Sequence, residues 1–322
     1  MRIAFLSQNP EYRAFAERLG QRLPSHEVRF QRVPAELDLD GVGAVMAAGC
    51  RVGREVLERP SVGFVQTIGT GYENVDVAAA SALGVWVANL RANVTGNAES
   101  VAEHALLLLL ALARRLREAE ASLAQGRWAH PVGMSLFGKR ACVVGLGDIG
   151  ALIAVRLQAL GMRVVGVRSH PEKGGPEGVQ VFGTDRLHDA LREADCVVLA
   201  ARADAHNQNL LDAPALAAMK RGALLVNIAR GSLVKPETLE AAVRSGQLGG
   251  VGLDVFWEEP VDPRHPLLQL PQVLGTPHVA GLTDVNLAGS LERAARNLEA
   301  FAAGRRPEFL VNTPATPRAA LG

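Results

Sequence analysis

Apolar residues follow two alternating periods along the first part of the chain. Five short, strongly apolar runs indicate strands, at residues 2–7, 27–31, 44–48, 62–67 and 85–88. Between them apolar residues recur with helical spacing, for example at residues 11–20 and 77–83. Strands that alternate with helices predict a parallel sheet covered by helices.

A second alternating series starts at Arg140. Its strands are expected at residues 140–144, 163–167, 196–200, 224–228 and 252–255, with a last short one at 273–276. Pro236 stands where the first turn of an intervening helix would begin. Helical spacing without Gly or Pro runs over residues 97–123, and a second long stretch covers residues 284–303. We expect the first stretch to be one continuous helix that joins two domains.

Composition and charge limit the kinds of molecule that the protein is expected to bind. The chain has 322 residues, 48% of them apolar, enough for two domains with cores of their own. Lys and Arg number 34 and Asp and Glu 33, so a net charge of +1 offers no basic field for nucleic acid. The longest apolar run, residues 105–113, is too short for a membrane span of about 20 residues. We therefore expect neither nucleic acid nor a membrane as partner.

The cysteines are not arranged as metal ligands or as a disulfide framework. Cys50, Cys142 and Cys196 are an odd set without a Cys-x-x-Cys pair. This pattern argues against structural disulfides and against a thiolate zinc site. We expect a cytoplasmic protein without a bound metal.

The clearest local motif is glycine-rich: Gly145-Leu146-Gly147-Asp148-Ile149-Gly150. It follows an apolar strand and precedes helical spacing, as in the first βαβ unit of a dinucleotide-binding domain. There Gly145 permits a tight turn, Gly147 lets the backbone approach a pyrophosphate, and Gly150 lets helix and strand pack closely. The helix N-terminus adds free N–H groups and positive partial charge. The motif favours a dinucleotide, with S-adenosylmethionine or a purely structural loop as alternatives.

The end of the next strand indicates which dinucleotide is preferred. An NAD site has Asp or Glu there to bond the ribose hydroxyls, whereas this chain has Arg168-Ser169-His170. A guanidinium binds a 2′-phosphate with paired hydrogen bonds, and a carboxylate would repel it. We predict that NADP(H) is preferred and that NAD(H) can also serve. The alternative is that Arg168 is an ordinary solvated arginine.

Three charged residues lie at or just beyond later strand ends: Arg230, Glu259 and His278. Ligands of open parallel sheets bind at the carboxyl ends of strands. Singly, each residue has an ordinary explanation, as a strand cap, a solvated charge or a core histidine. Together they suit a 2-keto acid, because arginine can hold its carboxylate and polarise its carbonyl while histidine gives the oxygen a proton. A neighbouring glutamate keeps that proton available near neutral pH.

Several motifs in order resemble those of one known family. They are residues 69–76 (GTGYENVD), 97–104 (NAESVAEH), the glycine-rich loop, 227–231 (NIARG), 254–260 (DVFWEEP) and 276–281 (TPHVAG). The chain resembles the D-isomer-specific 2-hydroxyacid dehydrogenase family over nearly its whole length. The resemblance implies an α/β fold with two Rossmann-like, doubly wound parallel-sheet domains.

The resemblance also implies how the domains are arranged along the chain. Residues 1–96 and 285–322 are expected to form a discontinuous substrate domain around an inserted NAD(P)-binding domain at residues 97–284. The helix near residues 97–123 is expected to link the domains and to form most of a homodimer interface. His104, on this helix, is expected to pack or cap within it.

Site roles follow from the resemblance, residue by residue. Arg230, Glu259 and His278 match the catalytic arginine, glutamate and histidine, and Glu259 rather than Glu258 is the matching carboxylate because it directly precedes a proline. Arg230 and His278 also contact substrate in this assignment. Asp254 matches a residue that contacts the nicotinamide carboxamide.

Two further positions of the family pattern concern the ligands. The backbone at Thr70 and Gly71 matches the loop whose N–H groups receive the substrate carboxylate. Arg202 and Asn207 stand where the family usually has a proline and a threonine, in a loop that borders the adenosine end of the cofactor. Arg202 is either a second positive contact for a 2′-phosphate or a residue that faces solvent.

The predicted function is reduction of a small 2-keto acid by NADPH to a D-2-hydroxy acid, with glyoxylate or hydroxypyruvate favoured. Oxidation of phosphoglycerate is less favoured because no regulatory domain follows residue 322, and formate oxidation because the family's formate enzymes are longer at the N-terminus. The alternatives are a non-catalytic dinucleotide-sensing protein of the corepressor type and a methyltransferase.

Overall fold

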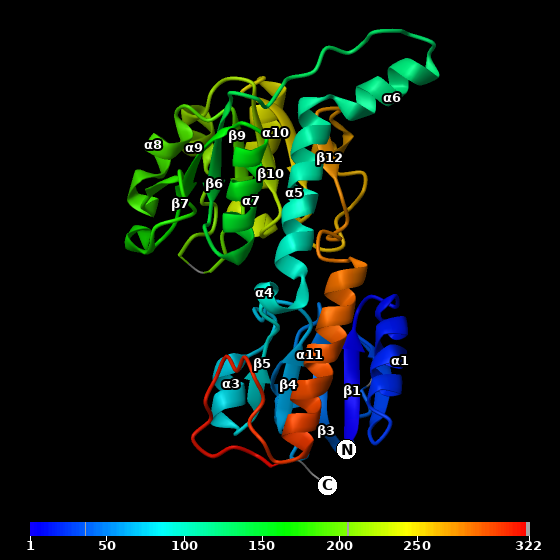
Figure 1. The fold of residues 1–322 in the computed structure, drawn as a ribbon. Coiled ribbons are helices and arrows are strands. Elements are labelled where there is room, and N and C mark those ends of the chain that lie inside the picture. The colour runs from blue at the N-terminus through cyan, green and yellow to red at the C-terminus, as the bar shows by residue number, and fades with distance from the viewer. Residues whose placement is uncertain (36, 205, 320–322) are drawn as a thin grey trace. The chain divides into compact units, whose positions relative to one another are not determined.

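The computed structural model describes residues 1–35, 37–204 and 206–319. They divide into two compact units, one made of Met1–Asn97 with the chain from Thr283 onward, the other of Ala98–Leu282. Each unit contains one parallel sheet with helices on its faces (Figure 1).

The smaller unit contains a five-stranded sheet in the order β2-β1-β3-β4-β5, parallel throughout. Its strands are β1 (Arg2–Ser7), β2 (Glu27–Arg32), β3 (Val42–Ala48), β4 (Phe64–Thr67) and β5 (Trp86–Ala88). Its helices are α1 (Tyr12–Arg22), α2 (Arg54–Leu57), α3 (Val77–Ala82), α4 (Ala92–Thr95) and α11 (Asp284–Ala302).

Both faces of this sheet are buried, because successive side chains of a strand point to opposite faces. Phe5 of β1 lies in a core with Leu19 of α1 and Leu298 of α11. Its neighbour Leu6 lies in a second core with Leu57 of α2. Apolar residues are therefore needed at the inner positions of β1, and this explains the continuous apolar run from Ile3 to Leu6.

The larger unit contains a seven-stranded sheet in the order β12-β11-β10-β9-β6-β7-β8, also parallel. Its strands are β6 (Arg140–Val144), β7 (Arg163–Val167), β8 (Gln180–Phe182), β9 (Cys196–Leu199), β10 (Ala223–Asn227), β11 (Leu248–Leu253) and β12 (Val273–Gly275). The strand order reverses beside β6, the point at which doubly wound sheets bind ligands.

Helices cover both faces of the larger sheet. They are α5 (Asn97–Ala113), α6 (Leu116–Ala124), α7 (Asp148–Ala159), α8 (Leu187–Leu191), α9 (Ala213–Ala218) and α10 (Pro236–Arg244), with short 3-10 helices at Pro171–Lys173, Thr184–Arg186, Gly231–Leu233 and Pro266–Gln269. Leu109 of α5 and Ile153 of α7 are buried in the core on one face. Leu216 of α9 and Leu239 of α10 are buried in the core on the other.

The predicted fold class is confirmed, since both sheets are parallel and lie between helices. The predicted strands are all present within a few residues, while β8 had no counterpart in the prediction. In the described part of the chain, no helix is both long enough and apolar enough to cross a membrane.

The single helix expected over residues 97–123 is wrong. The chain forms α5 and α6 instead, with Arg115 between them in the left-handed region at φ +51°. The returning segment lies against the end of α5, where Met134 N–H donates to the carbonyl of Ala113 at 2.7 Å. A Cβ on Gly133 would lie 2.9 Å from that same carbonyl oxygen, so the close approach requires glycine. The sequence of residues 97–123 contains no signal for this contact, because its partner residues lie further along the chain.

Candidate active site

The residues predicted for the site follow successive strands of the seven-stranded sheet. The glycine loop follows β6, Arg168 and Ser169 follow β7, Arg202 follows β9, Arg230 follows β10, Asp254 and Glu259 follow β11, and His278 follows β12. Because all seven strands are parallel, their carboxyl ends lie along one edge of the sheet. The fold therefore brings these residues to that edge.

The glycine loop has the shape that a bound pyrophosphate requires. Gly145 has φ +101°, and a Cβ there would meet the backbone of Ala201 at 2.4 Å. A Cβ on Gly150 would lie 1.8 Å from the carbonyl oxygen of Gly145, so the turn and α7 meet too closely for any side chain. A Cβ on Gly147 would meet nothing within 4 Å, and α7 begins directly after it. The loop thus leaves open backbone at a helix N-terminus, where an anion binds.

Arg168 is oriented by the loop that follows it. Its backbone N–H donates to Phe182 at 3.0 Å, and its Nη1 donates to the carbonyl of Gly174 at 2.7 Å. The guanidinium is half-buried, whereas Ser169 and His170 are exposed. Only one of the five guanidinium N–H donors is needed for the bond to Gly174. The side chain is thereby fixed with further donors in its planar fork, as phosphate recognition requires.

Glu259 and His278 form a direct pair. His278 Nδ1 lies 2.7 Å from Glu259 Oε2, and the backbone N–H of Phe256 donates to Glu259 Oε1 at 3.0 Å. Both oxygens of the carboxylate are thus engaged, and the side chain cannot turn away from the ring. Since Nδ1 faces Glu259, the ring presents Nε2 to any further partner.

The pair shifts the two pKa values in opposite directions. The hydrogen bond to Glu259 raises the pKa of His278 above its ordinary value, against the effect of partial burial, and the charges of Glu259 and Asp254 raise it further. Burial acts to raise the pKa of Glu259, but the hydrogen bond and charge of His278 outweigh it and lower that pKa. The arrangement therefore favours a charged imidazolium beside a carboxylate.

Arg230 belongs to the same cluster of charges. Its positive charge acts to lower both pKa values, opposing the rise at His278 and adding to the fall at Glu259. The Nη1 of Arg230 donates to the carbonyl of Ala229 at 2.7 Å, and the Nδ2 of Asn227 donates to the carbonyl of Arg230 at 2.9 Å. A Cβ on the next residue, Gly231, would lie 2.0 Å from the backbone of Phe256. Glycine there lets the loop of Arg230 approach the loop of Glu259.

Asp254 is buried, with only 1% of its surface exposed. Its Oδ1 accepts from the hydroxyl of Thr276 at 2.6 Å and from the N–H of Val279 at 2.9 Å, and its Oδ2 accepts from the N–H of Ala280 at 3.0 Å. The register of β11 and β12 pairs Leu253 with Gly275, so the next residue of each strand lies side by side. Asp254 therefore holds the loop that carries His278, and its expected contact with nicotinamide stays a prediction.

Sequence reasoning placed His104 within its helix, but its side chain bonds outside it. His104 Nε2 lies 2.9 Å from the hydroxyl oxygen of Thr276 and 3.5 Å from Asp254 Oδ1. The expectation of packing or capping within the helix is corrected accordingly. The only signal in the sequence was the presence of His104 in one of the quoted motifs, which did not identify its partner.

The loop after β9 is closed by its own side chains. Asn207 Nδ2 donates to the carbonyl of Arg202 at 2.7 Å, and Asn207 Oδ1 accepts from the N–H of Asp204 at 2.8 Å. Asn207, at the position where the family usually has a threonine, thus bonds to the backbone of Arg202 and Asp204. Arg202 itself is exposed, and both of its predicted roles stay open.

Thr70 and Gly71 lie in the smaller unit, in the loop after β4. Leu90 N–H donates to the carbonyl of Gly69 at 2.9 Å, and Asn89 Nδ2 donates to the carbonyl of Thr70 at 2.8 Å. Both carbonyls are thus turned toward the chain that follows β5. Asn89, which sequence reasoning missed, therefore fixes the loop whose N–H groups were assigned to a carboxylate.

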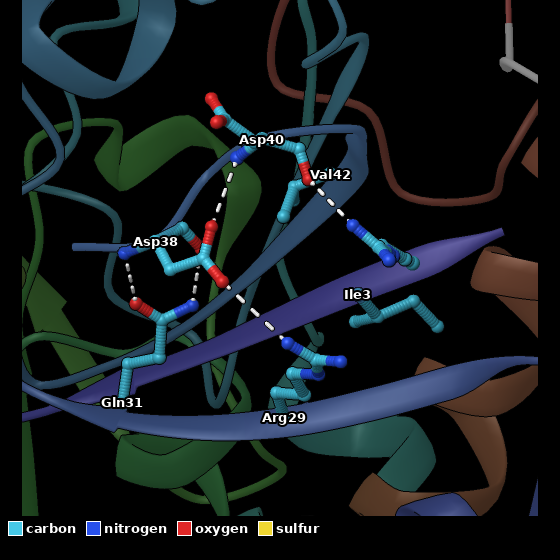
Figure 2. A pocket seen from close by; sticks show the side chains of 7 residues that line it. Ile3, Arg29, Gln31, Asp38, Asp40 and Val42 are labelled. Atoms are coloured by element: carbon cyan, nitrogen blue, oxygen red, sulfur yellow. Dashed lines mark hydrogen bonds and ion pairs between the residues drawn. The ribbon is translucent and has the colours of Figure 1, made fainter.

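A pocket elsewhere in the smaller unit does not fit a substrate. Figure 2 shows it at the edge of the sheet, where Arg29 faces Asp38 at 3.5 Å and Gln31 exchanges two hydrogen bonds with the backbone of Asp38. Its volume of about 10 Å³ corresponds to a single water molecule. Among residues 1–35, 37–204 and 206–319, no three His, Cys, Asp or Glu side chains are grouped to hold a metal ion.

Comparisons with known proteins identify the family of the chain. Residues 106–280 match the NAD binding domain of the D-isomer specific 2-hydroxyacid dehydrogenases. A glyoxylate reductase of Korarchaeum cryptofilum is 34% identical over 298 residues, which cover 90% of this chain and 86% of that protein. A D-3-phosphoglycerate dehydrogenase of Mycobacterium leprae is 41% identical over 228 residues, 70% of this chain and 42% of that protein.

A solved structure extends the similarity to nearly the whole chain. It is an NADPH-dependent glyoxylate/hydroxypyruvate reductase from Sinorhizobium meliloti in complex with NADP and malonate, 30% identical, with a TM-score of 0.84 over 99% of each chain. The chain belongs to the D-isomer-specific 2-hydroxyacid dehydrogenase family. It is an NAD(P)-dependent oxidoreductase of that family, and the predicted family and enzyme class are confirmed.

Glu259→Gln tests the origin of the raised pKa of His278. In the role predicted for His278 the protonated imidazole is needed for reduction, so kcat/KM is expected to fall as the pH rises through the pKa of His278. Without the Glu259 charge and hydrogen bond that pKa falls, and we expect the alkaline limb of the kcat/KM profile to move toward acid. The control is Glu258→Gln at the exposed neighbouring position. An alkaline limb that stays in place in Glu259→Gln would contradict the pairing.

Proposed function

We propose that this protein reduces a small 2-keto acid to the D-2-hydroxy acid, with NADPH as its preferred cofactor. The observation that carries the proposal is the contact of 2.7 Å between His278 Nδ1 and Glu259, with the charge of Arg230 acting on both groups. A proton donor and an anion-binding group in one place match the two polar groups of a 2-keto acid.

Each member of the cluster has one task. When bound along the glycine loop, the nicotinamide cofactor supplies the hydride. His278 delivers a proton from Nε2 to the carbonyl oxygen, because its Nδ1 is held by Glu259. Glu259 fixes the ring and maintains its charge, and Arg230 binds the substrate carboxylate and polarises the carbonyl. As the family pattern implies, we also assign the backbone N–H groups of Thr70 and Gly71, in the smaller unit, to the substrate carboxylate.

Glyoxylate and hydroxypyruvate are the substrates we favour. The relatives from Korarchaeum cryptofilum and Sinorhizobium meliloti carry these names, and each aligns over most of its own length. Both molecules place a carbonyl directly beside a carboxylate, which is the arrangement that Arg230 and His278 can bind together.

The preference for NADPH rests on Arg168. Its position after β7 puts a guanidinium, rather than a carboxylate, where the adenosine ribose is recognised in this class of fold. The bond from its Nη1 to Gly174 holds the side chain in one orientation. Its remaining donors suit a 2′-phosphate, and Ser169 adds a hydroxyl beside it.

The activity is tested with a panel of 2-keto acids at the nicotinamide absorbance band. We expect NADPH oxidation with glyoxylate or hydroxypyruvate, and a fall in kcat of roughly a hundredfold or more in His278→Ala. The dissociation constant of NADPH is expected to change little in that variant. If the wild-type protein oxidises no NADPH with any acid of the panel, the reductase proposal fails and a dinucleotide-sensing role is favoured.

Cofactor choice is tested by comparing kcat/KM for NADPH and NADH before and after Arg168→Asp. We expect the substitution to remove about 1–3 kcal/mol of preference for NADPH, the scale of a charge-assisted contact. Arg192→Asp, an exposed residue after α8, makes the same change of charge elsewhere and is expected to leave the preference intact. A wild-type preference for NADH would refute the assignment.

We also propose that the protein forms a homodimer through α5, α6 and the segment after them. Large apolar side chains are exposed there, among them Leu107, Leu123 at 73%, Trp128 at 91%, Val132 and Phe137. An apolar surface of this kind is unusual for a monomer. A second copy of the chain covers it in a symmetric, isologous interface.

Sedimentation velocity tests the dimer. The apparent mass of the wild-type protein is expected to be twice that of the 34.1 kDa chain. Leu107→Glu combined with Leu123→Glu places charges on the apolar surface and is expected to yield monomers. Val285→Glu, at an exposed apolar position on α11, is the matched control. A monomeric wild-type protein, or a dimer that persists in the double variant, would contradict the proposed interface.

A further inference from the structure

His278 has a backbone conformation that its own residue type disfavours. Its φ is +53°, in the left-handed region, although it carries a Cβ. This conformation is strained for a residue with a side chain, and it persists only where its surroundings hold it. The groups that hold His278 therefore decide where its imidazole lies.

Residues on both sides of His278 restrain its backbone, because they donate hydrogen bonds to the same carboxylate, that of Asp254. On the N-terminal side, the hydroxyl of Thr276 donates to Asp254 Oδ1. On the C-terminal side, the N–H groups of Val279 and Ala280 donate to the two oxygens of Asp254. Within the turn, the N–H of His278 donates to the carbonyl of Thr276 at 2.9 Å. The turn is thus tied to Asp254 before and after His278.

His104 completes this assembly from a distant helix. The hydroxyl of Thr276 has one hydrogen, and Asp254 receives it at 2.6 Å. The contact of 2.9 Å between His104 Nε2 and that hydroxyl must then have the imidazole as donor. The same Nε2 lies 3.5 Å from Asp254 Oδ1, and a carboxylate oxygen favours a donor rather than an acceptor as its neighbour. His104 is 13% exposed at its side chain, so water has little access to replace it.

We propose that His104 is a positioning residue for His278, acting through Thr276 and Asp254. By donating to the Thr276 hydroxyl it directs the hydroxyl proton onto Asp254, and it adds a positive partial charge beside a buried carboxylate. Asp254 then holds Val279 and Ala280, and with them the strained turn. The structural part stands alone, and the catalytic part rests on the proposed reductase function.

Four variants of the full-length protein separate this role from general stability. His104→Phe keeps a ring but removes the donor, and His104→Gln keeps a donor near the place of Nε2. Thr276→Val keeps the shape of the side chain but breaks the link, so it serves if His104→Phe does not fold. His188→Phe, at an exposed position on α8, is the matched control.

The first measurement is amide hydrogen exchange of a peptide covering residues 276–282, without substrate or cofactor. Exchange at Val279 and Ala280 is expected to rise by roughly fivefold or more in His104→Phe and Thr276→Val, the scale of one lost hydrogen bond. His104→Gln is expected to stay near wild type, and His188→Phe to match it. Unchanged exchange in His104→Phe and Thr276→Val overturns the proposal.

The second measurement is steady-state kinetics with NADPH and glyoxylate. In His104→Phe we expect kcat to fall by about ten- to hundredfold, because a misplaced proton donor slows the chemical step. The KM for NADPH is expected to be unchanged, and His104→Gln is expected to recover most of the loss. Equal kcat in His104→Phe and wild type overturns the catalytic part. If the wild type itself is inactive, the reductase proposal has failed, and the exchange measurement still decides the positioning role.

Discussion

A buried carboxylate imposes the strictest condition on the larger unit. Asp254 is taken out of water, and a charged group in that state needs hydrogen-bond donors for its oxygens. The donors available at the end of β11 are the hydroxyl and N–H groups of the turn after β12. The requirement to satisfy Asp254 thus also fixes the turn that carries His278. A structural need and a chemical one are met by the same contacts.

The parallel sheet explains why the charges of the site meet at all. Arg230, Glu259 and His278 come from loops after three different strands, whose carboxyl ends share one edge. Their charges are balanced there, because Glu259 and Asp254 raise the pKa of His278 while Arg230 lowers it. The imidazole can therefore hold a proton although a guanidinium acts on it as well. Two carboxylates around one histidine compensate for the neighbouring guanidinium.

Much of the fold was predictable because it depends on local or periodic features. The runs that became β1, β6 and β7 were predicted with their observed bounds, since strands covered on both faces need apolar residues throughout. The glycine spacing identified the turn before α7, where a Cβ would be too close to other atoms at Gly145 and Gly150. The break at Arg115 was missed because its cause, the approach of Gly133 and Met134, lies nearly twenty residues further along the chain.

The family, the order of the elements and the residue types of the site could be read from the amino acids alone, because motifs and apolar periods are local properties of the chain. The side chains that support the site became visible only in the folded domain. His104 and Thr276 are separated by 172 positions and meet only because α5 packs on the sheet next to the end of β12. Their contact depends on strand register and helix packing, which arise from the whole domain and leave no spacing to recognise in the sequence.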